Sequence, residues 1–264
     1  MEYQQIIYQP GTVARVILDR PQYYNAQSYV LLEEMDDAFA RAVADDAVRV
    51  IVLSGNGEHF SSGHDLGTPE SRADRERRGL PTTLREQYKQ LRAFNVENTL
   101  RWRNLPKPTI AMVHGYCIFG GWMIASAMDV IFASTDAKFL AGPVEYFCIP
   151  WDVDPRKAKE ILFESRFLSA QEAFEHHFVN RVVPREKLEE ETLAYARRVA
   201  ENDPFLVETS KFLVNNALDT MGFTASVEAA FQSYFGAIHP RLTEEAQNRR
   251  LAPVDLALRH LRET

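Results

Sequence analysis

Two adjacent glycines, Gly120 and Gly121, interrupt an apolar stretch that runs from His114 to Asp129. Glycine inside a helix costs about 1 kcal/mol relative to alanine, so a glycine pair there needs a physical reason. The pair falls where an apolar strand gives way to a helix predicted for residues 122–128. Helix N-termini present backbone N–H groups without intrahelical partners, and these groups stabilise negative charge that develops on a substrate oxygen. The alternative is a tight crossing of helix and strand, which also requires small residues.

A second loop of similar design is Phe60-Ser61-Ser62-Gly63-His64-Asp65-Leu66. It also follows a buried strand, predicted for residues 47–53, and it also leads into a helix. Two such junctions on neighbouring strands would aim two backbone N–H groups at one point. This arrangement is an oxyanion hole, which stabilises a charged carbonyl oxygen without a catalytic side chain.

The elements that position these loops alternate between strands and helices. Residues 13–18, 47–53, 109–113, 130–133 and 138–140 predict strands, and most are short apolar or β-branched runs. Residues following Ser28, together with 84–102, 155–163 and 169–176, predict helices. From Pro184 onward the pattern is helical over 186–202, 204–218, 225–238 and 243 to the end. This order predicts an α/β body followed by a helical tail that packs on the body, on another subunit, or on both.

A highly charged segment lies between the second loop and the 84–102 helix. Seven of the nine residues from Glu70 to Arg78 are charged. The simple interpretation is a solvated or mobile face.

Composition limits the classes of function. The 264 residues, 45% hydrophobic and 25% charged, are typical of one large globular domain or a domain with an appendage. A net charge of −7 and a pI near 5.6 argue against nucleic acid as the main partner. Neither a basic-then-apolar leader nor a run of about 20 apolar residues is present, so no membrane association is expected. Cys117 and Cys148 both lie in apolar surroundings, which favours a reduced, cytoplasmic protein, and no residue spacing indicates a metal site.

Four landmarks in order make the sequence similar to the crotonase, or enoyl-CoA hydratase/isomerase, superfamily. They are Asp19-Arg20-Pro21 with Asn25-Ala26; Phe60 to Leu66; Lys107-Pro108-Thr109-Ile110-Ala111 leading into His114-Gly115-Tyr116; and Gly120-Gly121 with Asp129. The resemblance covers most of the chain, from about Val13 to about Phe235. It implies an α/β fold, a crotonase-like spiral of ββα units over residues 1–195, and a helical C-terminal trimerisation region over residues 196–264.

The resemblance also implies a ligand and roles for individual residues. The ligand is a CoA thioester, with CoA as part of the substrate and no separate cofactor, and the assembly is a homotrimer or homohexamer. His64 and Gly120 would give the two backbone N–H groups that hold the thioester oxygen. The backbone around Ala26, Ser62 and Leu66 would contact the adenine and pantetheine. The charged segment could then be a lid over the acyl end, or its arginines could meet the CoA phosphates.

Hydratases of this family use two glutamates, and the sequence departs from that pattern at both positions. The first belongs three residues after Gly120, where this chain has Met123, and an ungapped alignment places Pro143 at the second. Trp122 and Met123 are therefore expected to shape an apolar acyl pocket. The sequence puts simple hydration in doubt.

Three acids beyond Pro143 could replace the glutamates: Glu145, Asp152 and Asp154. The run from Tyr146 to Trp151 would give them an apolar lining, which raises the pKa of a carboxyl group and suits a general acid or base. For Asp152 and Asp154 the alternative is a turn or a cap for the helix after Pro155.

Three hypotheses follow from the sequence. The first is an enoyl-CoA hydratase/isomerase family enzyme that forms an oxyanion-stabilised enolate and catalyses hydration, isomerisation or C–C cleavage. The second is a β-diketone hydrolase that uses the same hole for a ketone oxygen. The third is a non-catalytic member that binds acyl-CoA, which the replacement residues Met123 and Pro143 would favour.

Overall fold

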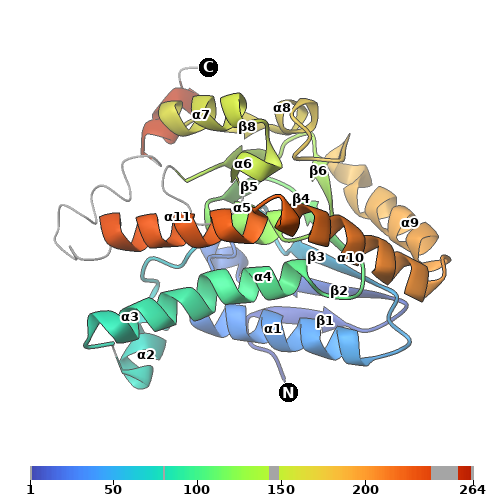
Figure 1. Ribbon diagram of the computed structural model, residues 1–264, viewed down its shortest axis with the longest axis horizontal. Coiled ribbons are helices and arrows are strands. Elements are labelled where there is room, and N and C mark those ends of the chain that lie inside the picture. Colours follow the sequence, from blue (N-terminus) through green and yellow to red (C-terminus); the bar gives the residue numbers. More distant parts are fainter. Residues whose placement is uncertain (1, 80, 143–148, 239–254, 263–264) are drawn as a thin grey trace.

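The computed structural model describes residues 2–79, 81–142, 149–238 and 255–262, and its centre is a six-stranded sheet (Figure 1). The strand order is β1 (Ile6–Gln9), β2 (Val13–Leu18), β3 (Val50–Gly55), β4 (Thr109–Val113), β6 (Val130–Ser134) and β9 (Arg181–Val183). Only the β1–β2 pair is antiparallel, and the other neighbours are parallel. The carboxyl ends of β3 and β4 therefore lie at the same edge, and both functional loops start there.

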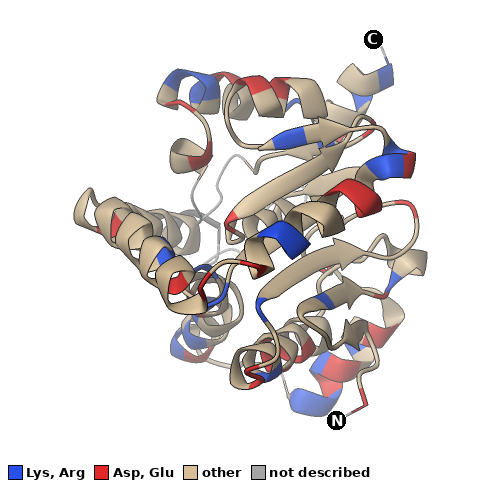
Figure 2. Cartoon of the chain, turned by 90° about the vertical axis from the view of Figure 1, so that its right-hand side faces the viewer, with Lys and Arg blue, Asp and Glu red and all other residues tan. Residues whose placement is uncertain are grey.

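Both faces of this sheet are covered, which explains why β3 and β4 read as continuous apolar runs. Helix α9 (Leu188–Ala200) packs on one face, where Val50, Val52 and Ile110 join its buried residues. Alternate residues such as Ile51 and Leu53 point into the main core with α1 (Tyr29–Ala44). Charged residues lie mainly on the helices and loops, while the central strands are largely free of them (Figure 2).

A second, three-stranded sheet consists of β7 (Lys138–Leu140) between β5 (Tyr116–Ile118) and β8 (Leu168–Ser169). β5 follows β4 after a turn at Gly115, whose φ is +55°. A side chain at Gly115 would collide with the carbonyl of Glu58, so only glycine fits this turn. The repeated return of the chain to two sheets is the crotonase-like α/β arrangement expected from the sequence.

The remaining helices surround the two sheets. They are α2 (Pro69–Arg78), α3 (Leu84–Leu91), the π-helical η2 (Arg92–Glu97), α4 (Asn98–Arg103), α5 (Gly120–Ser126), α6 (Ile149–Asp152), α7 (Pro155–Glu164), α8 (Ala170–Glu175), α10 (Pro204–Thr220) and α11 (Phe223–Ile238). Residues 255–262 are also helical, and two short 3-10 turns lie at Pro21–Tyr23 and Arg185–Lys187. None of the described helices is long and apolar enough to cross a membrane.

Several predicted helix starts are confirmed by their capping contacts. Ser28 accepts a hydrogen bond from the N–H of Leu31 at the start of α1, and Ser169 accepts one from Glu172 at the start of α8. The strand predicted for residues 47–53 starts three residues later than expected, at Val50, because the residues before it form the turn that enters the sheet. The predicted 84–102 helix contains η2, a widened π-helical segment that its apolar spacing did not indicate.

The charged segment is the helix α2, and most of its side chains are exposed, as expected for a solvated face, while its mobility stays a prediction. Ser71 and Asp74 of α2 are buried. Arg78 forms a bidentate ion pair with Glu33 of α1 and contacts Asp74 four residues earlier in its own helix. These charged side chains therefore pair with other side chains of the protein, which composition alone could not show.

The C-terminal helices cross the body, and a buried lysine fixes one of them (Figure 1). Lys211 of α10 lies 2.8 Å from Oδ2 of Asp129 and donates to the carbonyl of Lys107. Asp129 also accepts hydrogen bonds from the backbone and hydroxyl of Thr109, the first residue of β4. Burial lowers the pKa of Lys211, although Asp129 opposes that shift. The predicted boundary after residue 195 falls inside α9, which packs on the main sheet.

We expect Lys211→Met to lower the free energy of unfolding by about 1–3 kcal/mol, because it removes the ion pair of a largely buried ammonium group and leaves the partly exposed Asp129 without its cation. Chemical denaturation monitored by circular dichroism measures this change. Lys159→Met, the same substitution at an exposed position of α7, should change stability by less than about 0.5 kcal/mol. Equal effects of the two substitutions would contradict this role of Lys211.

Candidate active site

The two glycine loops meet at the first turn of α5. A Cβ atom on Gly63 would lie 3.0 Å from the backbone nitrogen of Gly120 and 2.6 Å from the carbonyl of Ile118. The loops are joined by backbone hydrogen bonds from Ser61 N–H to Tyr116 and from Ile118 N–H to Ser61. Gly63 has a φ of +89°, which disfavours any residue with a side chain.

Gly120 opens α5, so its N–H has no carbonyl within the helix to bind. The preceding Phe119 has φ 46° and ψ −105°, a sparsely populated backbone conformation for a residue with a side chain, and its side chain does not cap the helix. The backbone N–H of Phe119 donates to the carbonyl of Leu140 in β7. The structure therefore uses a strained turn to leave the start of α5 open.

His64 and Gln27 lie against Gly120 from the other side. A Cβ atom on Gly120 would lie 2.7 Å from Oε1 of Gln27 and 3.0 Å from Nδ1 of His64. Gln27 and His64 are paired through a parallel β-bridge, in which Gln27 N–H donates to Gly63 and Asp65 N–H donates to Gln27. The structure thus brings His64 and Gly120 together, with Gln27 beside them, and the use of their backbone N–H groups as an oxyanion hole stays a prediction.

A buried ion pair holds the loop that carries His64. Arg20 is 1% exposed, and its Nη1 lies 2.9 Å from Oδ2 of Asp65, which follows His64 directly. Arg20 also donates to the carbonyl of Ala26 and to the hydroxyl of Thr68. Burial opposes ionisation of Asp65, but hydrogen bonds from Thr68, Gly67 and Arg20 outweigh it and lower the pKa of Asp65.

Helix α2 supports the same loop from outside. Arg75 donates to the backbone carbonyl of Asp65 at 2.6 Å, and its guanidinium lies over the ring of Tyr29. A Cβ atom on Gly67 would lie 3.1 Å from the side chain of Arg72. These arginines therefore pack on the loop through α2, and their predicted contact with CoA phosphates stays a prediction.

Asp152 is the acid that the structure connects to α5. Its Oδ2 accepts a hydrogen bond from the indole N–H of Trp122, and its Oδ1 accepts one from the hydroxyl of Ser126, each at 2.6 Å. Trp122 and Ser126 are four residues apart, so both donors lie on one face of α5. Two donors to the two carboxylate oxygens stabilise the charged form and fix its orientation.

Trp122 has a supporting contact that the sequence did not predict. Its ring is 2% exposed and stacks on Phe178 at 4.1 Å between ring centroids, with Phe139 at its edge. The indole N–H is engaged by Asp152. Met123 is also buried, and the contact of either side chain with an acyl group stays a prediction.

Asp154 caps a helix, which is the alternative considered for it. Its Oδ1 accepts hydrogen bonds from the N–H groups of Arg156 and Lys157 at the start of α7. The carboxylate is exposed, and the backbone of Lys157 is the largest cause that lowers its pKa. Trp151 packs at the edge of the Phe223 ring, which joins α6 to α11.

The residues expected to contact CoA lie near the same loops. The N–H of Ala26 donates to Tyr23, and its carbonyl accepts from Arg20, so both backbone groups have protein partners. Ser62 N–H donates to Tyr24, and the side chain of Leu66 is largely exposed. Pro143, Glu145 and Cys148 lie outside the described residues.

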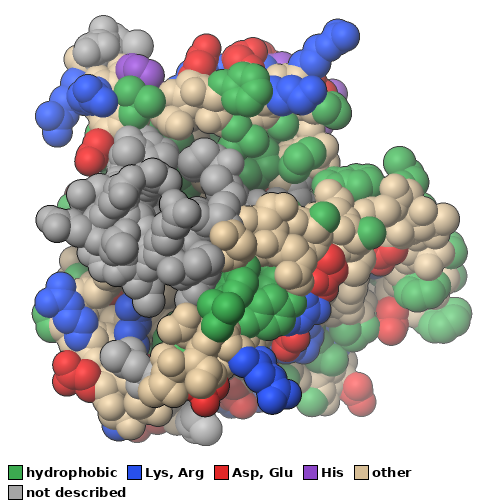
Figure 3. All heavy atoms as spheres, turned by 60° about the vertical axis from the view of Figure 1, so that its left-hand side comes forward, with side chains coloured by type: hydrophobic (Ala, Val, Ile, Leu, Met, Phe, Trp, Pro, Cys, Tyr) green, Lys and Arg blue, Asp and Glu red, His purple; other side chains and the backbone are tan. Residues whose placement is uncertain are grey.

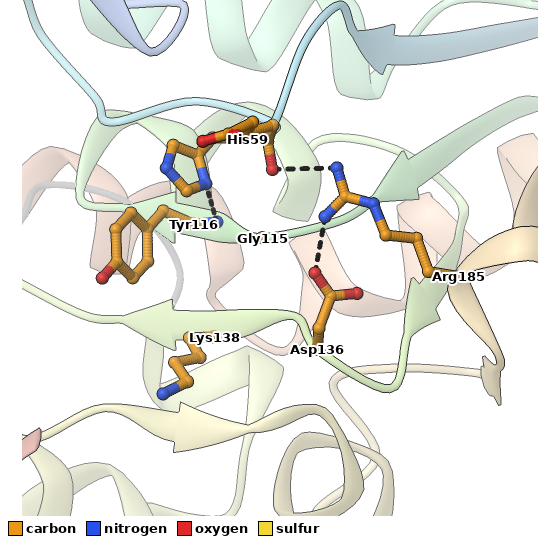
Figure 4. A pocket seen from close by; sticks show the side chains of 7 residues that line it. His59, Gly115, Tyr116, Asp136, Lys138 and Arg185 are labelled. Atoms are coloured by element: carbon orange, nitrogen blue, oxygen red, sulfur yellow. Dashed lines mark hydrogen bonds and ion pairs between the residues drawn. The ribbon is translucent and has the colours of Figure 1, made fainter.

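A surface pocket of about 340 Å³ lies at the opposite end of β5 from Gly120. Figure 4 shows Arg185 reaching both Asp136 and the 58–59 loop, and the His59 ring beside Tyr116. The backbone N–H of Tyr116 donates to Nδ1 of His59. Nearby, buried His114 contacts the carbonyl of Gly57 at the end of β4. The pocket groups are thus mostly paired with one another, and the candidate site is the one at Gly120.

Among the described residues no cluster of histidine, cysteine and acidic side chains could hold a metal ion. Cys117 is a free thiol, and burial raises its pKa well above the usual value. Sequence reasoning missed Gln27, Ser126 and the Arg20–Asp65 pair. The polar glutamine beside Ala26 and the arginine inside the first landmark were the available signals.

Comparison with known proteins identifies the family of the chain. Residues 9–239 match the family model described as enoyl-CoA hydratase/isomerase. The chain is 37% identical over 258 residues to a putative enoyl-CoA hydratase, EchA13, of Mycobacterium tuberculosis, covering 88% of this chain and 80% of the relative.

Solved structures give the same result. A probable enoyl-CoA hydratase from Mycobacterium smegmatis is 37% identical, with a TM-score of 0.83, and the match covers 91% of this chain and 96% of that one. A monofunctional enoyl-CoA isomerase from M. smegmatis is 27% identical, with a TM-score of 0.65 over 81% of this chain and 94% of that one.

We expect Asp65→Asn to lower the free energy of unfolding at pH 7 by about 1–3 kcal/mol, because it removes the buried anion of Arg20 and leaves only the half-exposed Glu70, 3.2 Å away, to pair with it. Because the pKa of Asp65 is lowered in the folded protein, its carboxylate stabilises the fold at pH values above the usual pKa of 3.8. This contribution is lost as the pH falls from 3.8 through the lower folded-state pKa. The Asp65→Asn variant should lack this part of the pH dependence of the free energy of unfolding.

Urea unfolding at a series of pH values measures both effects. The double variant Arg20→Met/Asp65→Asn should be less destabilised than the sum of the single variants, because it leaves neither charge buried alone. A cost below about 1 kcal/mol for Asp65→Asn, or strict additivity, would contradict the importance of the pair.

Proposed function

The chain belongs to the enoyl-CoA hydratase/isomerase family, and we propose that it acts on an acyl-CoA thioester through an enolate whose oxygen is held by the N–H groups of His64 and Gly120. The observation that carries the proposal is the contact between Gly63 and Gly120 at the first turn of α5. A crotonase-type enzyme is what the family match and the relatives support.

The chemistry follows from where charge develops. Removal of a proton next to a thioester places negative charge on the carbonyl oxygen. Two fixed N–H donors and the N-terminal end of α5 stabilise that charge more in the transition state than in the ground state. Removal of one donor of an oxyanion hole typically slows the reaction by about 100- to 1,000-fold.

Asp152 is the proton carrier in this proposal. Its carboxylate is oriented by Trp122 and Ser126 on the helix that begins at Gly120. A charged carboxylate accepts a proton from the substrate carbon and returns it to the same or another carbon. Glu145, which the sequence also predicts as a candidate, lies outside the described residues.

Two reactions fit this arrangement. Hydration is the reaction named for EchA13 and for the first M. smegmatis structure. Double-bond isomerisation is the second candidate, because a single carboxylate can move a proton between two carbons without activating water. The apolar Met123, at the position of the first family glutamate, favours it. CoA is part of the substrate in both cases, with Ala26, Ser62 and Leu66 beside it, and no separate cofactor takes part.

The experiment is mass spectrometry of the protein with a panel of 2-enoyl-CoA and 3-enoyl-CoA thioesters in ¹⁸O-labelled water and in D₂O. Hydration adds labelled oxygen, isomerisation moves the double bond without it, and enolate formation introduces deuterium beside the thioester. We expect Asp152→Asn to slow the deuterium exchange by about 100- to 10,000-fold.

Asp154→Asn is the matched control, since it makes the same change two residues away. Asp154 caps α7 and asparagine caps a helix about as well as aspartate, so this variant should lose less than about 0.5 kcal/mol of stability and keep its exchange rate. Unchanged exchange in Asp152→Asn, or equal losses in both variants, would remove Asp152 from the mechanism. Acyl-CoA binding without any exchange would favour the non-catalytic alternative, and cleavage of a β-diketone without CoA binding would favour the hydrolase.

We also propose that the protein is a homotrimer or homohexamer that uses α10. Phe205, Leu206, Phe212 and Leu213 form an apolar stripe, because residues seven apart lie on the same helix face. Each of these side chains is at least 60% exposed, although a soluble monomer rarely exposes such a stripe. Exposed hydrophobic side chains are visible on the protruding right-hand part of Figure 3.

We expect the double variant Phe205→Glu/Phe212→Glu to reduce the assembly to monomers, because two carboxylates cannot be buried unpaired in an apolar interface. Light scattering coupled to size exclusion measures the mass. Phe163→Glu, the same substitution on exposed α7, is the control and should leave the mass unchanged. A wild-type monomer at micromolar concentration would refute the proposal.

A further inference from the structure

Gln27 is a buried polar residue at the centre of the candidate site that the mechanism above does not use. Its backbone is fixed on both sides, by hydrogen bonds to Gly63 and from Asp65. Because Gln27 and His64 are bridge partners, their side chains lie on the same face of the pairing. The side chain therefore points to the region where His64 meets Gly120.

The carboxamide has one end anchored and the other end unused. Its Nε2 donates to the hydroxyl of Ser61 at 3.3 Å, and that hydroxyl donates to the carbonyl of Asn25. Its Oε1 accepts no hydrogen bond from any described residue, and it is not among the fully buried atoms that lack a partner, although Gln27 as a whole is only 4% exposed. This oxygen is therefore open to solvent, and a ligand can supply the donor that the protein does not.

The free oxygen lies beside Gly120, whose N–H would hold the thioester oxygen in the proposed site. It lies 2.7 Å from the position of a Cβ atom on Gly120, and Nδ1 of His64 lies 3.0 Å from the same position. If the N–H of Gly120 holds the thioester oxygen, the α and β carbons of the acyl chain lie within about two bonds of the carbonyl carbon. A hydroxyl group on either carbon can therefore approach the carboxamide of Gln27.

We propose that Gln27 is a specificity-determining residue that accepts a hydrogen bond from a hydroxyl group on the α or β carbon of the bound acyl-CoA. This inference rests on the proposed acyl-CoA function of the site. Ser61 holds the amide in one orientation, with the oxygen toward the ligand. A site built to bind a hydroxyl discriminates strongly against the analogue that lacks it, because its own polar group is then left unpaired.

The test compares the binding of 2-hydroxybutyryl-CoA, 3-hydroxybutyryl-CoA and butyryl-CoA by isothermal titration calorimetry. The Asp152→Asn background prevents turnover of the ligands. We expect at least one hydroxylated ligand to bind about tenfold or more tightly than butyryl-CoA. Gln27→Leu should weaken binding of that ligand by about 10- to 100-fold and change butyryl-CoA binding by less than about threefold.

Two further variants separate recognition from folding. Gln27→Met keeps the length of the side chain without the acceptor, and it should repeat the effect of Gln27→Leu if the latter folds poorly. Gln171→Leu, the same substitution on exposed α8, should leave all three affinities unchanged.

Three outcomes would overturn the proposal. In the first, Gln27→Leu weakens the binding of all three CoA esters equally. In the second, the variant keeps the preference for a hydroxylated ester. In the third, the protein that retains Gln27 shows no such preference. Failure of all three CoA esters to bind would instead overturn the acyl-CoA function itself, so the two proposals can fail separately.

Discussion

The close approach of two backbones, at Gly63 and Gly120, is the constraint on which the rest of the site depends. A side chain on Gly63 would meet the nitrogen of Gly120 and the carbonyl of Ile118, so the two loops can touch only as bare backbone. The parallel order of β2, β3 and β4 brings both loops to one sheet edge, and the second sheet fixes Phe119 through Leu140. Two sets of polar contacts support the residues around this contact. The ion pair of Arg20 and Asp65 holds one loop, and hydrogen bonds from Trp122 and Ser126 hold Asp152.

Much of the fold could be predicted because its signals are local. Apolar runs at β2, β3 and β4 and capping residues such as Ser28 and Ser169 identify elements from their immediate neighbours. The family landmarks then supplied the order of the loops and the meeting of His64 with Gly120. The π-helical segment η2 was missed because its apolar spacing differs little from that of an ordinary helix over one turn.

The supporting contacts could not be predicted, because they join residues far apart in the chain. Arg20 meets Asp65 across 45 positions, and Trp122 meets Asp152 across 30. Nothing in the charged run from Glu70 to Arg78 indicates that Arg78 pairs with Glu33 or that Arg75 holds the backbone of Asp65. The same limit applied to Asp152 and Asp154, which look alike in sequence and differ in which donors surround them.

The position of α2 has a consequence for how the surface of this protein can be altered. A charge-rich helix is usually the first place where residues are exchanged to improve solubility, crystallisation or labelling, on the assumption that such a helix interacts only with water. Here the inner arginine of the helix holds the carbonyl next to His64, and its last arginine attaches the helix to α1. Neutralising these cations would therefore loosen the geometry of a binding loop from a position that looks remote. Arg77, the most exposed cation of the helix for which an ion pair is found, is the safer residue to substitute or label.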